Sequence, residues 1–266
     1  YRRFPYLVRW LYALLDTVLF VSKKQAVQLQ ELAVAPRQIM VMGQLKFDVY
    51  IPQLSRDEIV SMRHGMGFVD LHQGSLFLMG VSTWSGEEEI LLQVTLSLRQ
   101  QGLDVRLILI PRHAERGEEI LSIVKKYGFS WSRRSTAEVA SDCIVHIADT
   151  TGEMYALCQC AHLGLVGKSF SPHQGGQTPL ELAVCGIPMV YGPHMSNFSE
   201  ICADLESQNL VTACSNAQHA QQVLAKLLCD TDYLDSKRHQ LQLWAQDQRG
   251  ALSVVEKKFD EFLGQV

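Results

Sequence analysis

The chain lacks the residue spacings that mark the common metal and thiol-redox sites. Its 266 residues include seven cysteines and nine histidines, but no Cys-x-x-Cys and no His-x-x-x-His. Those spacings are typical of zinc sites, and Cys-x-x-Cys is also typical of redox motifs, so we expect no metal. Most of the cysteines lie in apolar stretches, which favours reduced, buried thiols in a cytosolic protein.

Several catalytic motifs are also missing. The glycines fit neither the phosphate-binding P-loop nor the G-x-G-x-x-G turn that follows a strand, and no nucleophile elbow or Ser-His-Asp arrangement is present. NTP hydrolysis and hydride transfer are therefore not indicated. The net charge of −4 argues against nucleic acid as a partner.

No apolar stretch is long enough to suggest a membrane span. The longest, residues 4–20, contains Arg9 and Asp16 and is too short to cross a bilayer comfortably. We expect it to form a helix with one apolar face, followed by a strand. Arg2, Arg3 and Arg9 make this segment basic, which indicates either a local basic edge or contact with an anionic surface.

What the sequence does contain is a regular alternation of apolar strands and helices. Apolar residues make up 47% and charged residues 20%, as in ordinary globular proteins. Strands are expected at residues 17–22, 38–42, 75–81, 105–110, 143–147, 162–166, 187–191 and 209–213. Helices are expected at residues 23–32, 55–66, from 87, 118–127, 153–160, 179–184, 198–207, 217–228 and within 233–262. Continuous apolar strands that alternate with helices predict an α/β fold, a parallel sheet with both faces covered.

Four helix starts follow strands and share one pattern. Each has Ser, Thr or Asn followed three residues later by Glu, which predicts a capping box; the four lie at residues 85–88, 150–153, 178–181 and 197–200. In a parallel sheet these starts meet at the carboxyl edge, where such folds bind ligands. We regard Thr178 as the best formed, because Pro179 at the first helical position loses no hydrogen bond.

A glycine pair, Gly175-Gly176, precedes this best-formed start. Alone, the pair could simply make a tight turn. Together with the helix start it favours a site for a phosphorylated ligand, because free N–H groups there attract anions. A carboxylate beside a phosphate is unfavourable, so we expect Glu181 to bind a ribose hydroxyl instead.

Cationic residues add to this edge. Arg112 directly follows a strand and suits a phosphate or carboxylate, although an ion pair with Glu115 or Glu118 is the alternative. His113 could equally serve in capping or packing. Lys46 lies in a connector between two strand-and-helix units and, taken alone, would be a solvated lysine.

Six ordered motifs together resemble one family. GQLKFDV, STWSGEEE, PRHAER, DTTGEMY, GGQTPLE and GPHMSNFSE are similar to motifs of the 3-deoxy-D-manno-octulosonic acid (Kdo) transferases of Gram-negative bacteria. The resemblance implies a GT-B glycosyltransferase with two Rossmann-like domains and an inverting reaction that needs no metal. It also implies that the donor is CMP-Kdo and the acceptor is the lipid A precursor, lipid IVA. The expected location is the cytoplasmic face of the inner membrane, in lipopolysaccharide biosynthesis.

The resemblance assigns residues to roles. It predicts contacts with CMP at Pro111, Arg112, Gly152, Glu153, Met154, Thr178, Pro179, Leu180 and Glu181. Lys46 would stabilise charge in the transition state. Further candidates in or beside the same motifs are Ser82, Thr83, Gly86, His113, Gly175, Gly176, Gln177 and Asn197. Residues 1–45 would end the N-terminal acceptor-binding domain, and residues 46–266 would form the donor-binding domain with the closing C-terminal helices.

The chain departs from the family pattern in places. Trp84 stands where the family usually has His, Gln177-Thr178 stands where it has His-Asn, and Lys168 replaces a common Gly. The general-base Glu belongs to an N-terminal domain that is almost wholly outside these residues, together with the region that would meet the membrane. We therefore expect an N-terminally truncated fragment that binds donor weakly and transfers nothing.

Two other functions stay open from the residues alone. One is another GT-B sugar-nucleotide enzyme, either a UDP-sugar transferase or an epimerase. The other is a non-catalytic nucleotide-binding module.

Overall fold

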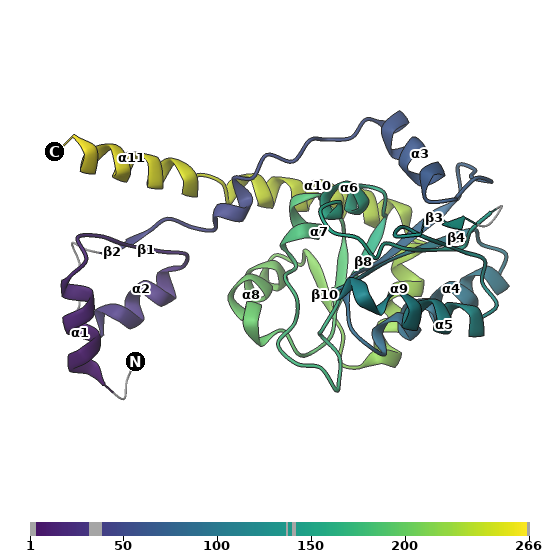
Figure 1. Ribbon diagram of the computed structural model, residues 1–266, viewed down its shortest axis with the longest axis horizontal. Coiled ribbons are helices and arrows are strands. Elements are labelled where there is room, and N and C mark those ends of the chain that lie inside the picture. Colours follow the sequence, from purple (N-terminus) through teal and green to yellow (C-terminus); the bar gives the residue numbers. More distant parts are fainter. Residues whose placement is uncertain (1–3, 32–38, 137, 140–141, 265–266) are drawn as a thin grey trace. The chain divides into compact units, whose positions relative to one another are not determined.

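The computed structural model describes residues 4–31, 39–136, 138–139 and 142–264. The chain forms two compact units (Figure 1): unit 1 comprises residues 1–50 and 244–266, and unit 2 comprises residues 51–243. The division into an acceptor-binding domain ending at residue 45 and a donor-binding domain stays a prediction.

Unit 2 is built around the expected parallel sheet. Its strands are β3 (Leu76–Thr83), β4 (Val105–Pro111), β5 (Trp131–Arg133), β6 (Glu138–Val139), β7 (Val145–Ile147), β8 (Leu163–Val166), β9 (Met189–Tyr191) and β10 (Val211–Ala213). They lie in the order β10-β9-β8-β3-β4-β7-β5-β6. Every neighbouring pair is parallel except β5 and β6. The α/β prediction is confirmed, while β5 and β6 were not predicted.

Helices cover both faces of this sheet. The helices of unit 2 are α3 (Arg56–Gly65), α4 (Glu87–Gln100), α5 (Gly117–Lys126), α6 (Met154–Gln159), α7 (Leu180–Val184), α8 (Ser199–Ser207) and α9 (Ala217–Leu228), with the short η3 (Ala114–Arg116) and η4 (Ser196–Phe198); α10 (Thr231–Asp247) follows. Figure 1 shows α4, α5 and α9 on one side of the sheet and α6, α7 and α10 on the other. Leu91 of α4 and Leu224 of α9 share a core with Leu78, Leu107 and Leu165 of the strands. Burial of such side chains supplies the main stabilisation of the unit.

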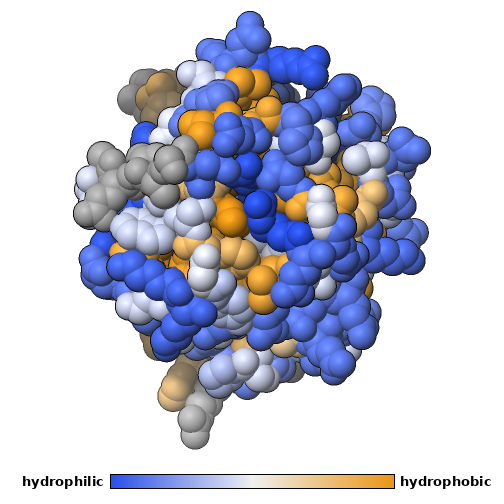
Figure 2. Space-filling model, turned by 90° about the vertical axis from the view of Figure 1, so that its right-hand side faces the viewer, coloured by the Kyte–Doolittle hydropathy of each residue, from blue (hydrophilic) through white to orange (hydrophobic). Residues whose placement is uncertain are grey.

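One face of the protein is shown in Figure 2. Its visible surface is mainly hydrophilic, and the apolar residues form separate areas on it. Scattered exposed apolar residues are normal for a protein surface.

Unit 1 contains α1 (Pro5–Ala13), β1 (Val18–Phe20), α2 (Lys23–Gln30), β2 (Ile39–Val41), η2 (Leu45–Phe47) and α11 (Ala251–Leu263). The expected helix and strand in residues 4–20 are thus confirmed. Strands β1 and β2 pair in parallel. The carboxylate of Asp48 accepts from the N–H groups of Gly250 and Leu252, both at 2.7 Å, and so caps α11. No helix within the described ranges is both long and apolar enough to span a membrane.

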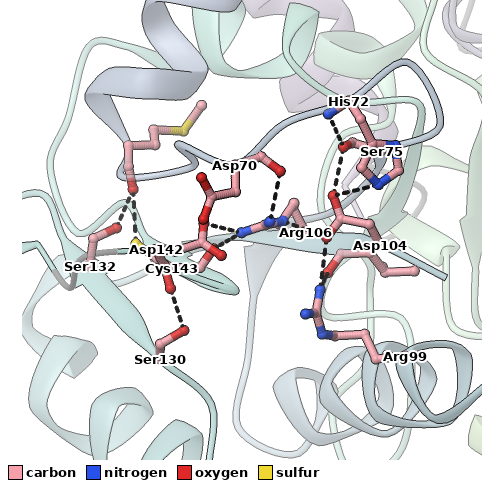
Figure 3. A network of polar contacts seen from close by, with 12 residues as sticks. Asp70, His72, Ser75, Arg99, Asp104, Arg106, Ser130, Ser132, Asp142 and Cys143 are labelled. Carbon is pink, nitrogen blue, oxygen red and sulfur yellow. Dashed lines mark hydrogen bonds and ion pairs between the residues drawn. The ribbon is translucent and has the colours of Figure 1, made fainter. Parts of the chain in front are cut away.

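A buried ionic network stabilises the amino edge of the unit 2 sheet (Figure 3). Arg106 of β4 is 3% exposed; its Nε donates to Asp104 at 2.8 Å and its Nη1 donates to Asp142 at 2.6 Å. The same Nη1 also donates to the carbonyl of Cys143 at 2.5 Å, and Arg99 donates to Asp104 at 2.9 Å. These bonds connect the starts of β4 and β7, so the network holds the edge opposite to the predicted ligand site.

All seven cysteines are free thiols, as expected. Six of them are buried, and Cys229 is exposed. Burial raises the pKa of Cys160 and of Cys214 to about 11, so these thiols stay protonated at neutral pH.

Candidate functional site

The predicted capping boxes are the main point at which the structure corrects the sequence. Ser55 does form one with Glu58 at the start of α3, but none of the four boxes at the carboxyl edge forms. Helix α4 is preceded by Gly86, with φ of +93°, and no side chain caps it. Helices α6 and α8 begin after Glu153 and Phe198, again without a side-chain cap. Glu88 instead pairs with Arg116, and Glu153 pairs with Arg134; local spacing does not reveal these tertiary partners.

At the remaining start, residues 178–181, Thr178 has a weaker capping role than predicted. The helix itself is short, five residues from Leu180, and Pro179 is its cap residue and not its first helical residue. The Thr178 hydroxyl still accepts from the N–H of Leu180 at 3.2 Å. Asn197, by contrast, lies in η4, and its N–H donates to the carbonyl of Gly175 at 3.0 Å.

The predicted ligand residues of unit 2 nevertheless come together at one edge. Pro111, Gly152, Thr178 and Asn197 lie on segments that end or follow β4, β7, β8 and β9, and parallel strands bring these ends to one side. The centre of this edge is between β3 and β8, neighbours in the sheet. The chain continues from β3 toward β4 and from β8 toward β9 on opposite sides, so a crevice for a ligand is expected where the following loops diverge.

The end of β3 and the loop after β8 pack tightly against each other at that point. A Cβ on Gly167 would lie 2.1 Å from the carbonyl oxygen of Ser82, so only glycine fits there. Ser82, at the irregularity near the end of β3, and Lys168, on the loop after β8, both have left-handed backbones, with φ of +53° and +57°. Such angles are uncommon for residues other than glycine and concentrate at functional sites.

A buried carboxylate fixes the second loop. Glu87 is 1% exposed, and its two oxygens accept from the N–H groups of Trp84 at 2.9 Å, Lys168 at 2.8 Å, Ser169 at 2.9 Å and Phe170 at 3.3 Å. Burial raises the pKa of Glu87, although the four N–H groups oppose this change. Glu87 thus joins the start of α4 to the loop after β8, a role that the sequence did not indicate.

The glycine pair forms the turn that the sequence predicted. Gly175 and Gly176 have φ of +100° and +74°, which favours glycine at both positions. The N–H of Gly176 donates to the carbonyl of Lys168 at 3.0 Å, and the N–H of Gln177 donates to that of Gly167 at 2.9 Å. The turn therefore folds back on the loop after β8 and leads into Thr178.

An open pocket of about 450 Å³ adjoins this turn. Gly175 lines it on one side, His194 and Met195 from the loop after β9 line it on another, and Cys202 and Glu206 of α8 complete the wall. The pocket provides space beside the turn for part of a ligand.

The arginines near this edge fall into two groups. Arg116 donates to buried Glu88 at 2.8 Å, Arg133 donates to Asp149 at 2.5 Å, and the Nε of Arg134 donates to Glu153 at 3.1 Å. These three are therefore neutralised.

Arg112 and Lys168 differ from those arginines. Within the described ranges, neither has a carboxylate within 4.0 Å. Glu115 instead lies 3.4 Å from His113, and Glu118 pairs with Arg133, so the alternative ion pairs of Arg112 are not observed. Two cationic side chains therefore remain available for an anion at this edge.

The segment after β7 carries three of the predicted CMP contacts. Gly152 is exposed, with φ of +96°, and Glu153 and Met154 are half-buried. The Arg134 guanidinium lowers the pKa of Glu153, and the hydroxyl of Thr150 also donates to this carboxylate at 2.8 Å. Glu153 is thus held ionised, as a group that could accept from a sugar hydroxyl.

Pro179 and Leu180 are buried, whereas Glu181 is half-buried. Burial and, secondarily, the charge of Glu181 raise the pKa of Tyr155 in α6, so Glu181 lies near α6.

Lys46 belongs to η2 of unit 1, and its role stays a prediction.

Two buried donors at the edge lack partners. The hydroxyl of Thr83, which is 0% exposed, and the indole Nε1 of Trp84 have no hydrogen-bond partner within the part of the chain that the structure describes. Buried donors are nearly always paired in proteins, so both favour a site completed by a ligand or by water. No group of three or more His, Cys, Asp or Glu among the described residues is arranged to hold a metal ion.

Known proteins resemble this chain. No family model matches it. A 3-deoxy-D-manno-octulosonic acid transferase of Haemophilus influenzae is 33% identical over 152 residues, which is 56% of this chain and 35% of that protein. The transferase of the same name from Bordetella pertussis is 26% identical over 229 residues, which is 84% of this chain and 52% of that protein. The chain thus spans about a third to a half of the length of these relatives.

Solved structures agree. The C-terminal CMP-Kdo binding domain of WaaA from Acinetobacter baumannii has a TM-score of 0.60 at 24% identity, over 72% of this chain and 96% of that domain. A glycosyltransferase from Rickettsia africae has a TM-score of 0.60 at 12% identity, over 98% of this chain and 66% of that structure. At such identities the likeness shows the fold, that of GT-B glycosyltransferases. Together with the sequence matches, it confirms that the chain is a relative of the Kdo transferases.

Proposed function

We propose that this relative of the Kdo transferases supplies the donor-binding part of an inverting glycosyltransferase. The donor is CMP-Kdo, and the whole protein would move Kdo to the lipid A precursor, lipid IVA, at the cytoplasmic face of the inner membrane during lipopolysaccharide biosynthesis. The observation that carries the proposal is the Bordetella match, a Kdo transferase aligned over 84% of this chain.

The geometry supports a nucleotide at the carboxyl edge of unit 2. Arg112 would hold the phosphate by its charge, beside the turn from Gly175 to Thr178. Glu153 and Glu181 would accept from the ribose hydroxyls. Lys46 would stabilise the charge on the departing CMP, and the general base would come from the part of the relatives that this chain does not span.

Ligand-dependent melting tests the nucleotide preference. The 266-residue chain is melted with CMP, UMP and UDP at equal concentrations, because at equal concentration the ligand that binds the folded state more tightly raises the melting temperature more. CMP should give the largest increase. If UMP or UDP protects better, the proposal fails in favour of a UDP-sugar enzyme; if no nucleotide raises it, the donor-binding proposal is wrong.

A further inference from the structure

Lys168 lies at a position where a lysine is conformationally unfavourable. Its backbone is left-handed, with φ of +57°, a region that favours glycine. Its N–H donates to Glu87 at 2.8 Å, and its carbonyl accepts from Gly176 at 3.0 Å. The residue is therefore anchored on both sides, between the buried carboxylate and the glycine turn.

Its side chain has an aromatic support. The Lys168 ammonium lies 4.7 Å from the centre of the Trp84 ring, close enough for a cation–π interaction. Trp84 is itself held between two histidines: the ring centres of His113 and His173 lie 5.2 Å and 5.1 Å from it. His173 is fixed in turn by a 2.9 Å contact between its Nε2 and the carbonyl oxygen of Ser85. The cluster joins the loops after β3, β4 and β8.

The surrounding charges leave the ammonium available. No carboxylate of the described residues lies within 4.0 Å of it. Carboxylates on the neighbouring segments have other partners: Glu87 accepts from backbone N–H groups, and Glu88 and Glu119 are bonded to Arg116. A cation that is supported by an indole but lacks an anionic partner fits an anionic ligand.

We propose that Lys168, positioned by Trp84, is an anion-binding residue of this site that contacts either the phosphate or the sugar carboxylate of an acidic sugar nucleotide. This inference rests on the proposed donor, which carries both groups. Lys168 touches the ligand, and Trp84 holds Lys168 in position.

Calorimetric titration of the 266-residue chain with cytidine, CMP and CMP-Kdo distinguishes the two anions. Lys168→Met removes the charge and retains much of the length. If Lys168 contacts the phosphate, this variant binds CMP about tenfold more weakly, as expected for one charge-assisted hydrogen bond, and binds cytidine as before. If it contacts the carboxylate, the loss is confined to CMP-Kdo. Lys168→Arg should retain most of the affinity in either case.

The chain offers a matched control. Lys125 lies over Trp131 at 5.1 Å, at the last turn of α5 and away from the ligand edge. Lys125→Met should leave all three affinities unchanged. The inference is wrong if Lys168→Met binds all three ligands like the unchanged chain, or if it weakens cytidine as much as CMP. If the unchanged chain itself does not bind CMP, the proposed function is wrong, and the inference about Lys168 is wrong as well.

A double-mutant cycle tests the role of Trp84. Trp84→Leu alone should weaken the same ligand several-fold, because the ammonium loses its support. In the Lys168→Met background it should cause no further loss. Full additivity of the two losses would contradict a positioning role for Trp84.

Discussion

Replacement of Glu87 by Gln tests how the ligand edge is held together. One carboxylate oxygen accepts from Trp84 and Lys168, and the other accepts from Ser169 and Phe170. An amide has a single oxygen, so its NH₂ group must face two backbone N–H donors and leave them unpaired. Each buried unpaired group costs about 1–3 kcal/mol. Relief of the buried charge offsets part of this, so we expect a net loss of about 2–3 kcal/mol.

Two measurements check this value. Since about 1 kcal/mol shifts the melting temperature of a domain of 150–250 residues by about 2–4 °C, Glu87→Gln should lower it by roughly 4–12 °C. One pair of amides, either Trp84 and Lys168 or Ser169 and Phe170, should also exchange hydrogen faster, because that pair loses its acceptor. Glu115→Gln, at an exposed carboxylate, is the control and should melt within about 1 °C of the unchanged chain. If Glu87→Gln also melts within about 1 °C of the unchanged chain, and the amide hydrogen exchange is unchanged, Glu87 does not hold the loop after β8.

Three further predictions concern the rest of unit 2. Arg106→Met leaves two acidic partners without their shared donor and should cost about 3–5 kcal/mol in urea unfolding; an unchanged midpoint would contradict the role of the network. Burial lowers the pKa of His146 to about 4 and that of His162 to about 3, both from 6.5. As the pH falls, these two histidines are therefore protonated in the unfolded chain at a higher pH than in the folded chain. Stability should fall between pH 6.5 and 4, by roughly 2–3 kcal/mol for each histidine, and equal urea midpoints at pH 7 and 4.5 would refute this. Gly167→Ala places a methyl group against the Ser82 carbonyl, so it should lower both the melting temperature and the calorimetric affinity for CMP; unchanged values of both would show that the end of β3 and the loop after β8 can separate without cost.

The parallel sheet could be predicted because its strands are buried on both faces and read as continuous apolar stretches. All seven residues of β4 are buried, for example. Strands β5 and β6 gave no such signal, because they are short and contain Ser132, Arg133 and Glu138. They depend on pairing with β7 and with each other at one end of the sheet, which is tertiary information.

The sequence predicted where the candidate site lies in the fold better than it predicted the contacts that hold the site together. The order of motifs placed the loops correctly at one edge, since strand direction alone determines which ends meet. The box predicted at residues 85–88 failed because Glu88 pairs with Arg116, 28 residues away. The neighbouring Glu87 has partners more than 80 residues away, and no local spacing encodes either set of contacts. The same is true of the contact between Trp84 and Lys168. A capping box does form between Ser55 and Glu58, where both side chains are exposed and bond to each other.

Because six cysteines are buried and one is exposed, thiol labelling can report local opening of the fold without any introduced label. A thiol reagent should modify Cys229 alone in the folded chain and all seven cysteines in the unfolded chain. Cys158 and Cys185 lie in α6 and directly after α7, so their labelling would report motion of the helices beside the ligand edge, without any introduced label. A ligand that closes this edge would then reduce the number of modified cysteines per molecule, which mass spectrometry measures directly.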